Sequence, residues 1–201
     1  MGIGAARRRF FFLLQKEPDL ADVEAKILAA DIIYVGGGNT LKMMRRWRFL
    51  GVDKILKKAY DRGAVMCGIS AGSICWFEFG HSDSMSSYSP DDWEYIKVRG
   101  LGWIKGIHCP HYDSDTLGVP RRESFQQMME QQGGIGIALD DNCALEVIDG
   151  NFFKILTSKA GAGAYKIYRE RGKVISIPIT QTKELLPIAV LYIRHRENRE
   201  K

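Results

Sequence analysis

The stretch Val65-Met66-Cys67-Gly68-Ile69-Ser70-Ala71-Gly72-Ser73-Ile74-Cys75 decides the fold. An apolar run ends in Gly-x-Ser-x-Gly, and an apolar, helix-compatible segment follows it. This order predicts a strand, a sharp turn and a helix, which together make a nucleophile elbow. The motif also occurs in ordinary glycine-rich turns, so the prediction of a nucleophile elbow depends on the strand before it and the helix after it. Ser70 is the candidate nucleophile, because the turn would lift its hydroxyl out of the sheet beside a helix N-terminus.

Apolar strands alternate with amphipathic helices on both sides of this stretch. We expect strands at residues 10–14, 32–35, 64–69, 104–109, 134–139, 144–148, 152–156, 173–179 and 188–193. We expect helices at residues 19–30, 39–50, 52–61, 71–77 and 121–132. The polar segment at residues 81–100 is predicted to be a surface loop. The alternation favours an α/β fold with three layers, in which helices cover both faces of a mostly parallel sheet.

Length and composition are typical of one globular domain spanning residues 1–201. The chain has 45% hydrophobic and 26% charged residues, with a mild net charge of +5. Much of the positive charge lies in Arg7-Arg8-Arg9 and in a charged tail at residues 194–201. Neither run has interleaved aromatic residues, so we expect solvated termini and no nucleic-acid partner.

The cysteines and the apolar runs indicate in which cellular compartment the protein is expected. Four cysteines occur without a C-x-x-C pair, at positions 67, 75, 109 and 143. They are typical of reduced, mostly buried thiols, which favours a cytoplasmic location. The apolar run at residues 10–14 is too short to span a bilayer, so no membrane association is expected.

A serine nucleophile needs a base, and His111 is the best placed of the four histidines. It follows the end of the strand at residues 104–109, and Pro110 stiffens the turn before it. His108 alternates within that strand, where a buried structural role is the simpler interpretation. His108, Cys109 and His111 would lack a fourth ligand at a familiar spacing, so no metal is expected.

An acid must orient the base, and backbone amides must bind the oxyanion. The candidate acids are Asp83, Asp113, Asp115, Asp140 and Asp141. Asp140 and Asp141 follow the carboxyl end of an expected strand, although aspartate is also common in turns there. For the oxyanion hole we expect the backbone N–H of Ala71 and one from Gly37 or Gly38, where glycine allows close approach. A phosphate loop is a weaker interpretation of these glycines, because the Gly-Lys-Ser/Thr ending is absent.

Five segments together resemble one known family. They are Tyr34-Val35-Gly36-Gly37-Gly38-Asn39-Thr40, Gly68-Ile69-Ser70-Ala71-Gly72-Ser73, Ser82-Asp83-Ser84, Cys109-Pro110-His111-Tyr112 and Ile137-Ala138-Leu139-Asp140-Asp141-Asn142. In this order they resemble the dipeptidase E (aspartyl dipeptidase) and cyanophycinase family of serine peptidases, over about residues 18–170. Gly-Gly-Gly-Asn-Thr combined with Ser-Ala-Gly is the specific part of this resemblance.

The resemblance implies a fold similar to class I glutamine amidotransferases and hydrolysis without metal or cofactor. It implies Ser70 as nucleophile and His111 as general base. The third member stays open between Asp83, on the loop after the elbow, and Asp141, after a later strand. Relatives have further strand–helix units ahead of this region, so the resemblance leads us to expect a shortened N-terminal part. Apolar sheet edges exposed in this way would favour a homodimer.

The resemblance also implies a substrate class: small peptides, most of all dipeptides with an N-terminal aspartate. Asn39, Arg121 and Arg122 are the candidate substrate-binding residues, the arginines because an acidic substrate needs a basic pocket. Two other functions fit the same residues. One is a catalytically silent relative that acts as a binding or scaffolding subunit. The other is an amidase or esterase that uses the same elbow.

Overall fold

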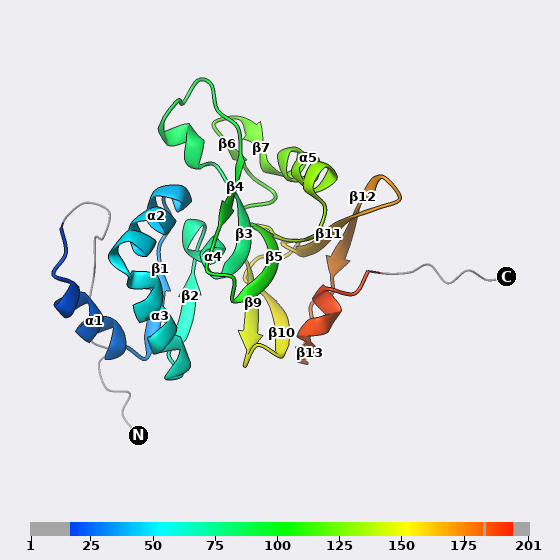
Figure 1. Cartoon of the computed structure of the whole chain (residues 1–201). Helices are drawn as coiled ribbons and strands as arrows, with labels where there is room; N and C mark the ends of the chain where they lie inside the picture. The colour runs from blue at the N-terminus through cyan, green and yellow to red at the C-terminus, as the bar shows by residue number, and fades with distance from the viewer. Residues whose placement is uncertain (1–16, 183, 195–201) are drawn as a thin grey trace.

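Six strands form the largest sheet, in the order β12-β11-β8-β5-β3-β4 (Figure 1). Their bounds are β3 Phe77–Ser82, β4 Ile96–Arg99, β5 Ile104–Cys109, β8 Ile135–Leu139, β11 Ala164–Glu170 and β12 Lys173–Ile179. Strands β3, β5 and β8 are parallel, whereas β4, β11 and β12 run antiparallel to their neighbours. The α/β fold is therefore confirmed, but this sheet is mixed where we expected a mostly parallel one.

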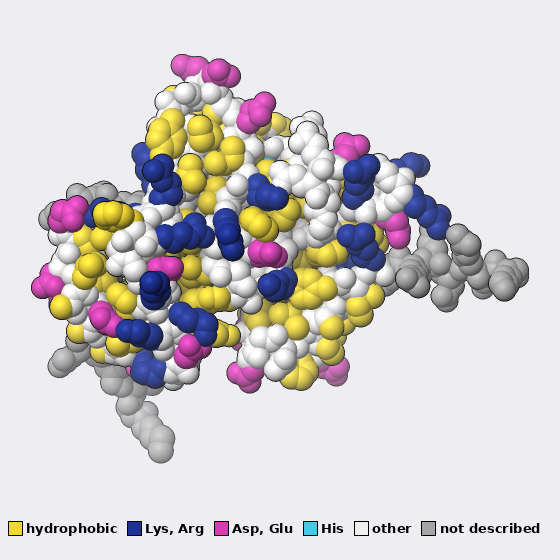
Figure 2. Space-filling view, in the orientation of Figure 1, with side chains coloured by type: hydrophobic (Ala, Val, Ile, Leu, Met, Phe, Trp, Pro, Cys, Tyr) yellow, Lys and Arg dark blue, Asp and Glu magenta, His cyan; other side chains and the backbone are white. Residues whose placement is uncertain are grey.

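This computed structural model describes residues 17–182 and 184–194. The predicted strand at residues 10–14 lies outside the described residues, as does the charged tail beyond Arg194. Within the described ranges, no helix combines the length and the apolar character that crossing a membrane requires. On the face drawn in Figure 2, basic, acidic and apolar side chains are interspersed.

A separate parallel pair, β1 (Ile32–Val35) and β2 (Val65–Gly68), leads into the candidate site. Helices α1 (Leu20–Leu28), α2 (Thr40–Leu50) and α3 (Val52–Asp61) lie beside this pair in Figure 1, and their apolar side chains share one core with it. The opposite face carries Ile32, Tyr34 and Val65, which are 66%, 64% and 57% exposed. Among the described residues, helices therefore cover one face of this pair, where we expected both.

Two different layers cover the six-stranded sheet. Helix α5 (Arg121–Gln132) packs Phe125 and Met129 against one face, beside Ile107 of β5. A second sheet, ordered β13-β10-β9, packs Phe153 against Ile137 on the other face. Its strands are β9 Cys143–Ile148, β10 Phe152–Thr157 and β13 Leu186–Pro187. The second layer on this side is thus a β-sheet, where the predicted architecture placed helices.

Three local predictions were wrong, each because tertiary contacts decide the segment. The polar segment at 81–100 contains the end of β3, a 3₁₀ turn (Ser84–Ser87) and β4, which pairs with β3. Strand β11 was missed because its central Lys166 breaks the apolar pattern, yet that lysine is buried on carbonyls of Val190 and Ile193. The strand expected at 188–193 is instead a 3₁₀ turn, Ile188–Leu191, that supplies one of those carbonyls.

Candidate active site

Ser70 occupies a strained turn between β2 and the short helix α4 (Ala71–Ile74). Its backbone has φ 56° and ψ −120°, which a residue with a side chain adopts at a cost of about 1–3 kcal/mol. Ser70 is partly exposed, whereas the next residue, Ala71, is buried. This is the geometry of a nucleophile elbow, and α4 ends three residues earlier than the expected helix at 71–77.

The two glycines of Gly-x-Ser-x-Gly allow three backbone segments to touch. A Cβ on Gly72 would lie 2.0 Å from the carbonyl oxygen of Val35, and one on Gly68 would lie 2.3 Å from the carbonyl oxygen of Gly72. The ends of β1 and β2 and the start of α4 are therefore in van der Waals contact through backbone alone. Any side chain at either position would push α4 off the sheet.

The expected oxyanion-hole amides lie beside the serine. A Cβ on Gly37 would lie 3.3 Å from Ser70 Cβ, so the Gly37 backbone approaches the elbow closely. Gly38 follows with φ 142°, a conformation that favours glycine. In the described part of the chain, the N–H groups of Gly37, Gly38 and Ala71 donate to no protein acceptor.

His111 and Asp141 form a hydrogen-bonded pair. His111 Nδ1 contacts Asp141 Oδ1, and Ser114 Oγ donates to the other carboxylate oxygen at 2.7 Å. The Asp141 backbone N–H also donates to Asp113 Oδ1 at 2.7 Å. Partial burial raises the pKa of Asp141, but the hydrogen bonds from His111 and Ser114 outweigh it, and the net pKa lies below its usual value. Asp141 is therefore ionised at neutral pH and holds the imidazole through Nδ1.

His111 is fixed in a second strained position, with φ 54°. Because Nδ1 faces the carboxylate, Nε2 is the nitrogen that is free to exchange a proton. Among the described residues, Ser70 Oγ makes no hydrogen bond to His111. In serine hydrolases with an empty site, the bond between the nucleophile and its base is often long and shortens only in the substrate complex.

Asp83, the other candidate for the third member, has different partners. Its Oδ2 accepts hydrogen bonds from the Arg121 guanidinium and from Thr116 Oγ1, the latter at 3.0 Å. The Arg121 side chain is 5% exposed and also lies over the Tyr95 ring. Asp83 thus neutralises a buried arginine, and among the described residues it contacts no imidazole.

The three candidate substrate-binding residues, Asn39, Arg121 and Arg122, differ in whether their polar groups already have partners. Both ends of the Asn39 amide are used, since its oxygen caps α2 at Lys42 N and its nitrogen donates to Ser84 O. Arg121 is occupied by Asp83. Arg122 is half exposed and lies 4.5 Å from the ring centroid of Tyr112, which follows His111 in the chain. Arg122 is therefore a partly exposed basic group that contacts the residue after His111 and lies 3.9 Å from Asp140, the residue before Asp141.

Sequence reasoning missed several residues of this region. Ser114 supports Asp141, and Ser73 Oγ lies 2.9 Å from His108 Nε2. A serine three residues after His111 carried no signal of its own. Ser73 lay inside the quoted motif at i+3 from Ser70, which places it on the same side of a helix and could have drawn attention.

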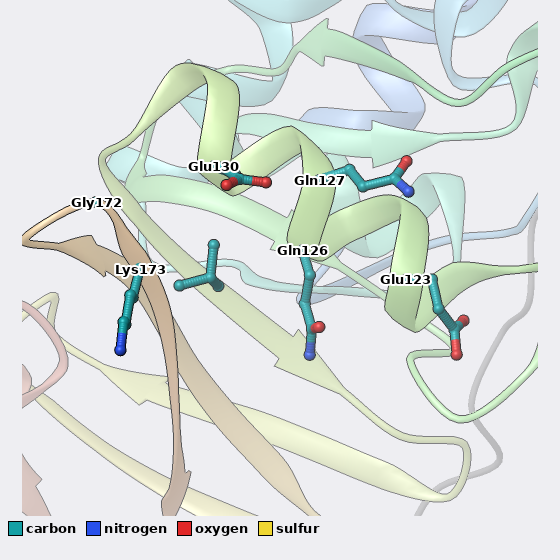
Figure 3. Close-up of a pocket in the computed structure, with 7 residues that line it drawn as sticks. Glu123, Gln126, Gln127, Glu130, Gly172 and Lys173 are labelled. Carbon is teal, nitrogen blue, oxygen red and sulfur yellow. The ribbon is translucent and has the colours of Figure 1, made fainter.

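One surface hollow lies away from these residues, between α5 and the β11–β12 turn (Figure 3). It is lined by Glu123, Gln126, Gln127, Glu130, Gly172, Lys173 and Val174. None of the predicted site residues contributes to it. In the described ranges, no three His, Cys, Asp or Glu side chains gather so as to hold a metal ion.

Fold and site first define a class. An α/β protein that presents a serine on a strained strand-to-helix turn, beside unoccupied backbone amides, has the architecture of an acyl-transfer hydrolase. A crystal structure of a peptidase from an acI-B1 Actinobacterium shares the fold, with a TM-score of 0.58 at 14% identity. The match covers 83% of this chain and 63% of that one. The shared fold is the glutamine amidotransferase-like one that we expected.

The family follows from sequence similarity. The model of Peptidase family S51 matches residues 10–155, so the chain belongs to Peptidase family S51, a family of serine peptidases. The uncharacterized peptidase YgaJ of Bacillus subtilis is 35% identical over 164 residues, which are 81% of this chain and 67% of YgaJ. The uncharacterized peptidase Lmo0363 of Listeria monocytogenes is 25% identical over 128 residues, 61% of this chain and 60% of that protein.

Proposed function

We propose that this chain is a serine exopeptidase that hydrolyses small peptides through an acyl-enzyme on Ser70. The observation that carries the proposal is the Ser70 backbone, held at φ 56° directly before α4. A strained turn of this kind is retained where it positions a reacting group. Membership of Peptidase family S51 supports the same reaction class.

In the proposed reaction, Ser70 Oγ attacks the peptide carbonyl and its proton passes to His111 Nε2. The developing oxyanion accepts hydrogen bonds from Ala71 N–H and from Gly37 or Gly38 N–H. The carbon–nitrogen bond breaks as the imidazolium returns the proton to the leaving amine. Water then hydrolyses the acyl-enzyme, with His111 as the base again. Asp141 serves as the third member, because it is the carboxylate hydrogen-bonded to His111.

Dipeptides with an N-terminal aspartate are the proposed substrates. Arg122 would pair with the substrate side-chain carboxylate, since its guanidinium is half exposed and follows the His111 loop through its contact with Tyr112. Asp140 Oδ1 lies 3.9 Å from Arg122 and has no hydrogen-bond partner among the described residues. A guanidinium held loosely by one carboxylate can turn toward another at low cost.

A fluorophosphonate probe tests the nucleophile directly, because it reacts only with an activated serine. We expect covalent labelling of the wild-type chain at Ser70, identified by peptide mass mapping, and no labelling of Ser70→Ala with an unchanged melting temperature. Hydrolysis of Asp-X dipeptides should disappear in the same variant. Wild-type protein that folds but resists the probe would contradict the enzyme and favour a silent binding subunit.

A substrate panel then separates the peptidase from the amidase or esterase. Asp-Leu, Ala-Leu, an aspartyl amide and a simple ester differ only at the acyl side chain or the leaving group. We expect Asp-Leu to be hydrolysed at least tenfold faster than Ala-Leu, and Arg122→Gln to abolish that preference. Faster turnover of the ester with no response to Arg122→Gln would overturn the proposed substrate.

A further inference from the structure

A chain of hydrogen bonds joins the helix after Ser70 to the middle of the six-stranded sheet. Ser73, in α4, places its Oγ 2.8 Å from the Ser70 carbonyl oxygen and 2.9 Å from His108 Nε2. His108 lies on β5 and is fully buried, and its Nδ1 is 2.9 Å from the carbonyl oxygen of Ile137 on β8. Three elements, α4, β5 and β8, are thus connected through one serine and one imidazole.

The donor and the acceptor of each hydrogen bond in this series can be assigned from the Ile137 carbonyl at its far end. A carbonyl oxygen only accepts, so His108 Nδ1 carries the hydrogen and donates it to Ile137. Burial lowers the pKa of His108 to about 4, so the ring is neutral at pH 7 and Nε2 must accept. Ser73 Oγ is its donor. The Ser70 carbonyl does not depend on that proton, since it already accepts from the N–H groups of Ser73 and Ile74 at 3.0 Å each.

The imidazole itself has little freedom. Its ring stacks on the Phe77 ring, with centroids 4.4 Å apart and planes 14° from parallel. A ring that is stacked, buried and bonded at both nitrogens is a rigid support, because each rotation would break a contact inside a close-packed core.

The bond between Ser73 and His108 lies between the two sheets that carry Ser70 and His111. Ser70 follows β2, which belongs to the two-stranded pair, whereas His111 follows β5 of the six-stranded sheet. No ladder of hydrogen bonds joins these two sheets in the described part of the chain. Helix α4, with only four residues, lies at their junction and packs on both β2 and β3. The Ser73 bond to His108 ties this short helix to β5, the same strand that leads to His111.

We propose that Ser73 and His108 are positioning residues, which hold the Ser70 turn at the distance from His111 that acylation requires. The inference rests on the proposed function of Ser70 as nucleophile. Ser73 and His108 take no part in proton transfer to the substrate, because His108 is sealed in the core. Their loss would leave substrate binding intact and slow the chemical step, since a small misplacement of reacting groups costs a large factor in rate.

The test compares Ser73→Ala with Ser73→Thr and with a matched control, Ser86→Ala. Ser86 Oγ likewise lies 2.8 Å from a carbonyl oxygen three residues earlier, that of Asp83, but among the described residues it contacts no imidazole. We expect Ser73→Ala to lower the rate of fluorophosphonate labelling at Ser70, and kcat for the dipeptide, at least tenfold, with KM changed less than twofold. Ser73→Thr should recover the rate to within threefold, and Ser86→Ala should equal the wild type.

A second variant keeps the test decisive if Ser73→Ala folds poorly. His108→Asn retains an amide near the Nδ1 position for Ile137 and removes the acceptor of the Ser73 hydroxyl. It should lose the same factor in labelling rate, and the double variant should lose no more, because both changes break one interaction. Wild-type labelling rates in folded Ser73→Ala or His108→Asn would overturn the positioning role alone. A wild-type chain that is not labelled would overturn the proposed function as well.

Discussion

At the scale of single residues, two residues of the candidate site have unusual backbone conformations. Ser70 and His111 have φ values of 56° and 54°, where side chains are disfavoured. Each costs about 1–3 kcal/mol, and the fold retains both. The carboxylate beside His111 is held by several hydrogen bonds. Asp141 accepts from the side chains of His111 and Ser114, and its backbone N–H donates to Asp113. The hydrogen bonds of Asp141 thus fix the orientation of the His111 ring.

Replacement of Asp141 by asparagine should remove the group that orients His111. An amide can hold the wrong imidazole tautomer and cannot stabilise the imidazolium, so we expect kcat to fall about 10³–10⁴-fold. Thermal unfolding should change little, because the Asp141 side chain is 43% exposed. Steady-state hydrolysis of an Asp-X dipeptide measures the effect.

Asp83→Asn is the counterpart that separates the two candidate acids. It leaves the buried Arg121 without its charge partner, so we expect the free energy of unfolding to fall by about 2–3 kcal/mol. At a temperature where the variant is folded, kcat should stay within tenfold of the wild type. A loss of kcat as large as that of Asp141→Asn would contradict our assignment of the third member.

At the scale of elements, glycine spacing decides how closely α4 meets the ends of β1 and β2. The β1 carbonyl of Val35 accepts from Ile69 N–H and lies against the Gly72 backbone. This contact holds the elbow beside Gly37, which belongs to the segment expected to supply the oxyanion hole. A strand, a turn and a helix thus form one unit whose geometry depends on the absence of two side chains.

Gly72→Ala should disrupt this unit. The new methyl would lie 2.0 Å from the Val35 carbonyl oxygen, so α4 must move, and we expect a loss of about 1–3 kcal/mol in the free energy of unfolding. The labelling rate at Ser70 should fall at least tenfold. Gly36→Ala is the matched control, since nothing lies within 4 Å of its Cβ position, and its change should be within about 0.5 kcal/mol. Equal stability of the two variants would argue against close backbone packing at Gly72.

At the scale of the whole molecule, two buried histidines couple stability to pH. Burial and the nearby Arg121 lower the pKa of His81 to about 3, and burial lowers that of His108 to about 4. Both would titrate near 6.5 in the unfolded chain. Between pH 6.5 and about 4, the unfolded chain therefore binds protons that the folded chain does not. Stability is full above pH 6.5 and is lost as the pH falls through this window.

We expect the free energy of unfolding to fall on the order of 3 kcal/mol from His108 alone between pH 7 and pH 4. Urea unfolding at pH 7, 6, 5 and 4.5 measures this slope. His81→Gln should be less stable at pH 7 and show a shallower decline, because one proton uptake is removed. An unchanged slope in that variant would mean that His81 does not contribute.

The homodimer also belongs to this scale and stays a prediction. Ile32, Tyr34 and Val65 present one apolar face of the β1–β2 pair. If a second copy covers it, sedimentation should show association that increases with protein concentration, and Tyr34→Lys should weaken it at least tenfold. Identical behaviour of wild type and Tyr34→Lys would exclude this face.

The elbow could be predicted from sequence because its causes are local. Small residues at 68 and 72, an apolar strand before Ser70 and a helix-compatible segment after it specify the turn within eleven positions. Several other strands were predictable for the same reason, but β3 and β4 were not expected, because their segments were assigned to a helix and a polar loop. The prediction also failed for β11 and for the turn at 188–191. Those two depend on Lys166, whose burial on distant carbonyls no local pattern indicates.

Only the tertiary structure shows which of the two candidate acids, Asp83 or Asp141, contacts His111. Asp83 follows β3 and Asp141 follows β8, and both strands pair in parallel with β5, one on each side. Either carboxylate could therefore reach the residue after β5 as judged from strand order. Packing of α5 brought Arg121 to Asp83, and the turn after β8 brought Asp141 to His111. Contacts between segments thirty or more residues apart depend on how layers pack, which the local order of residues does not encode.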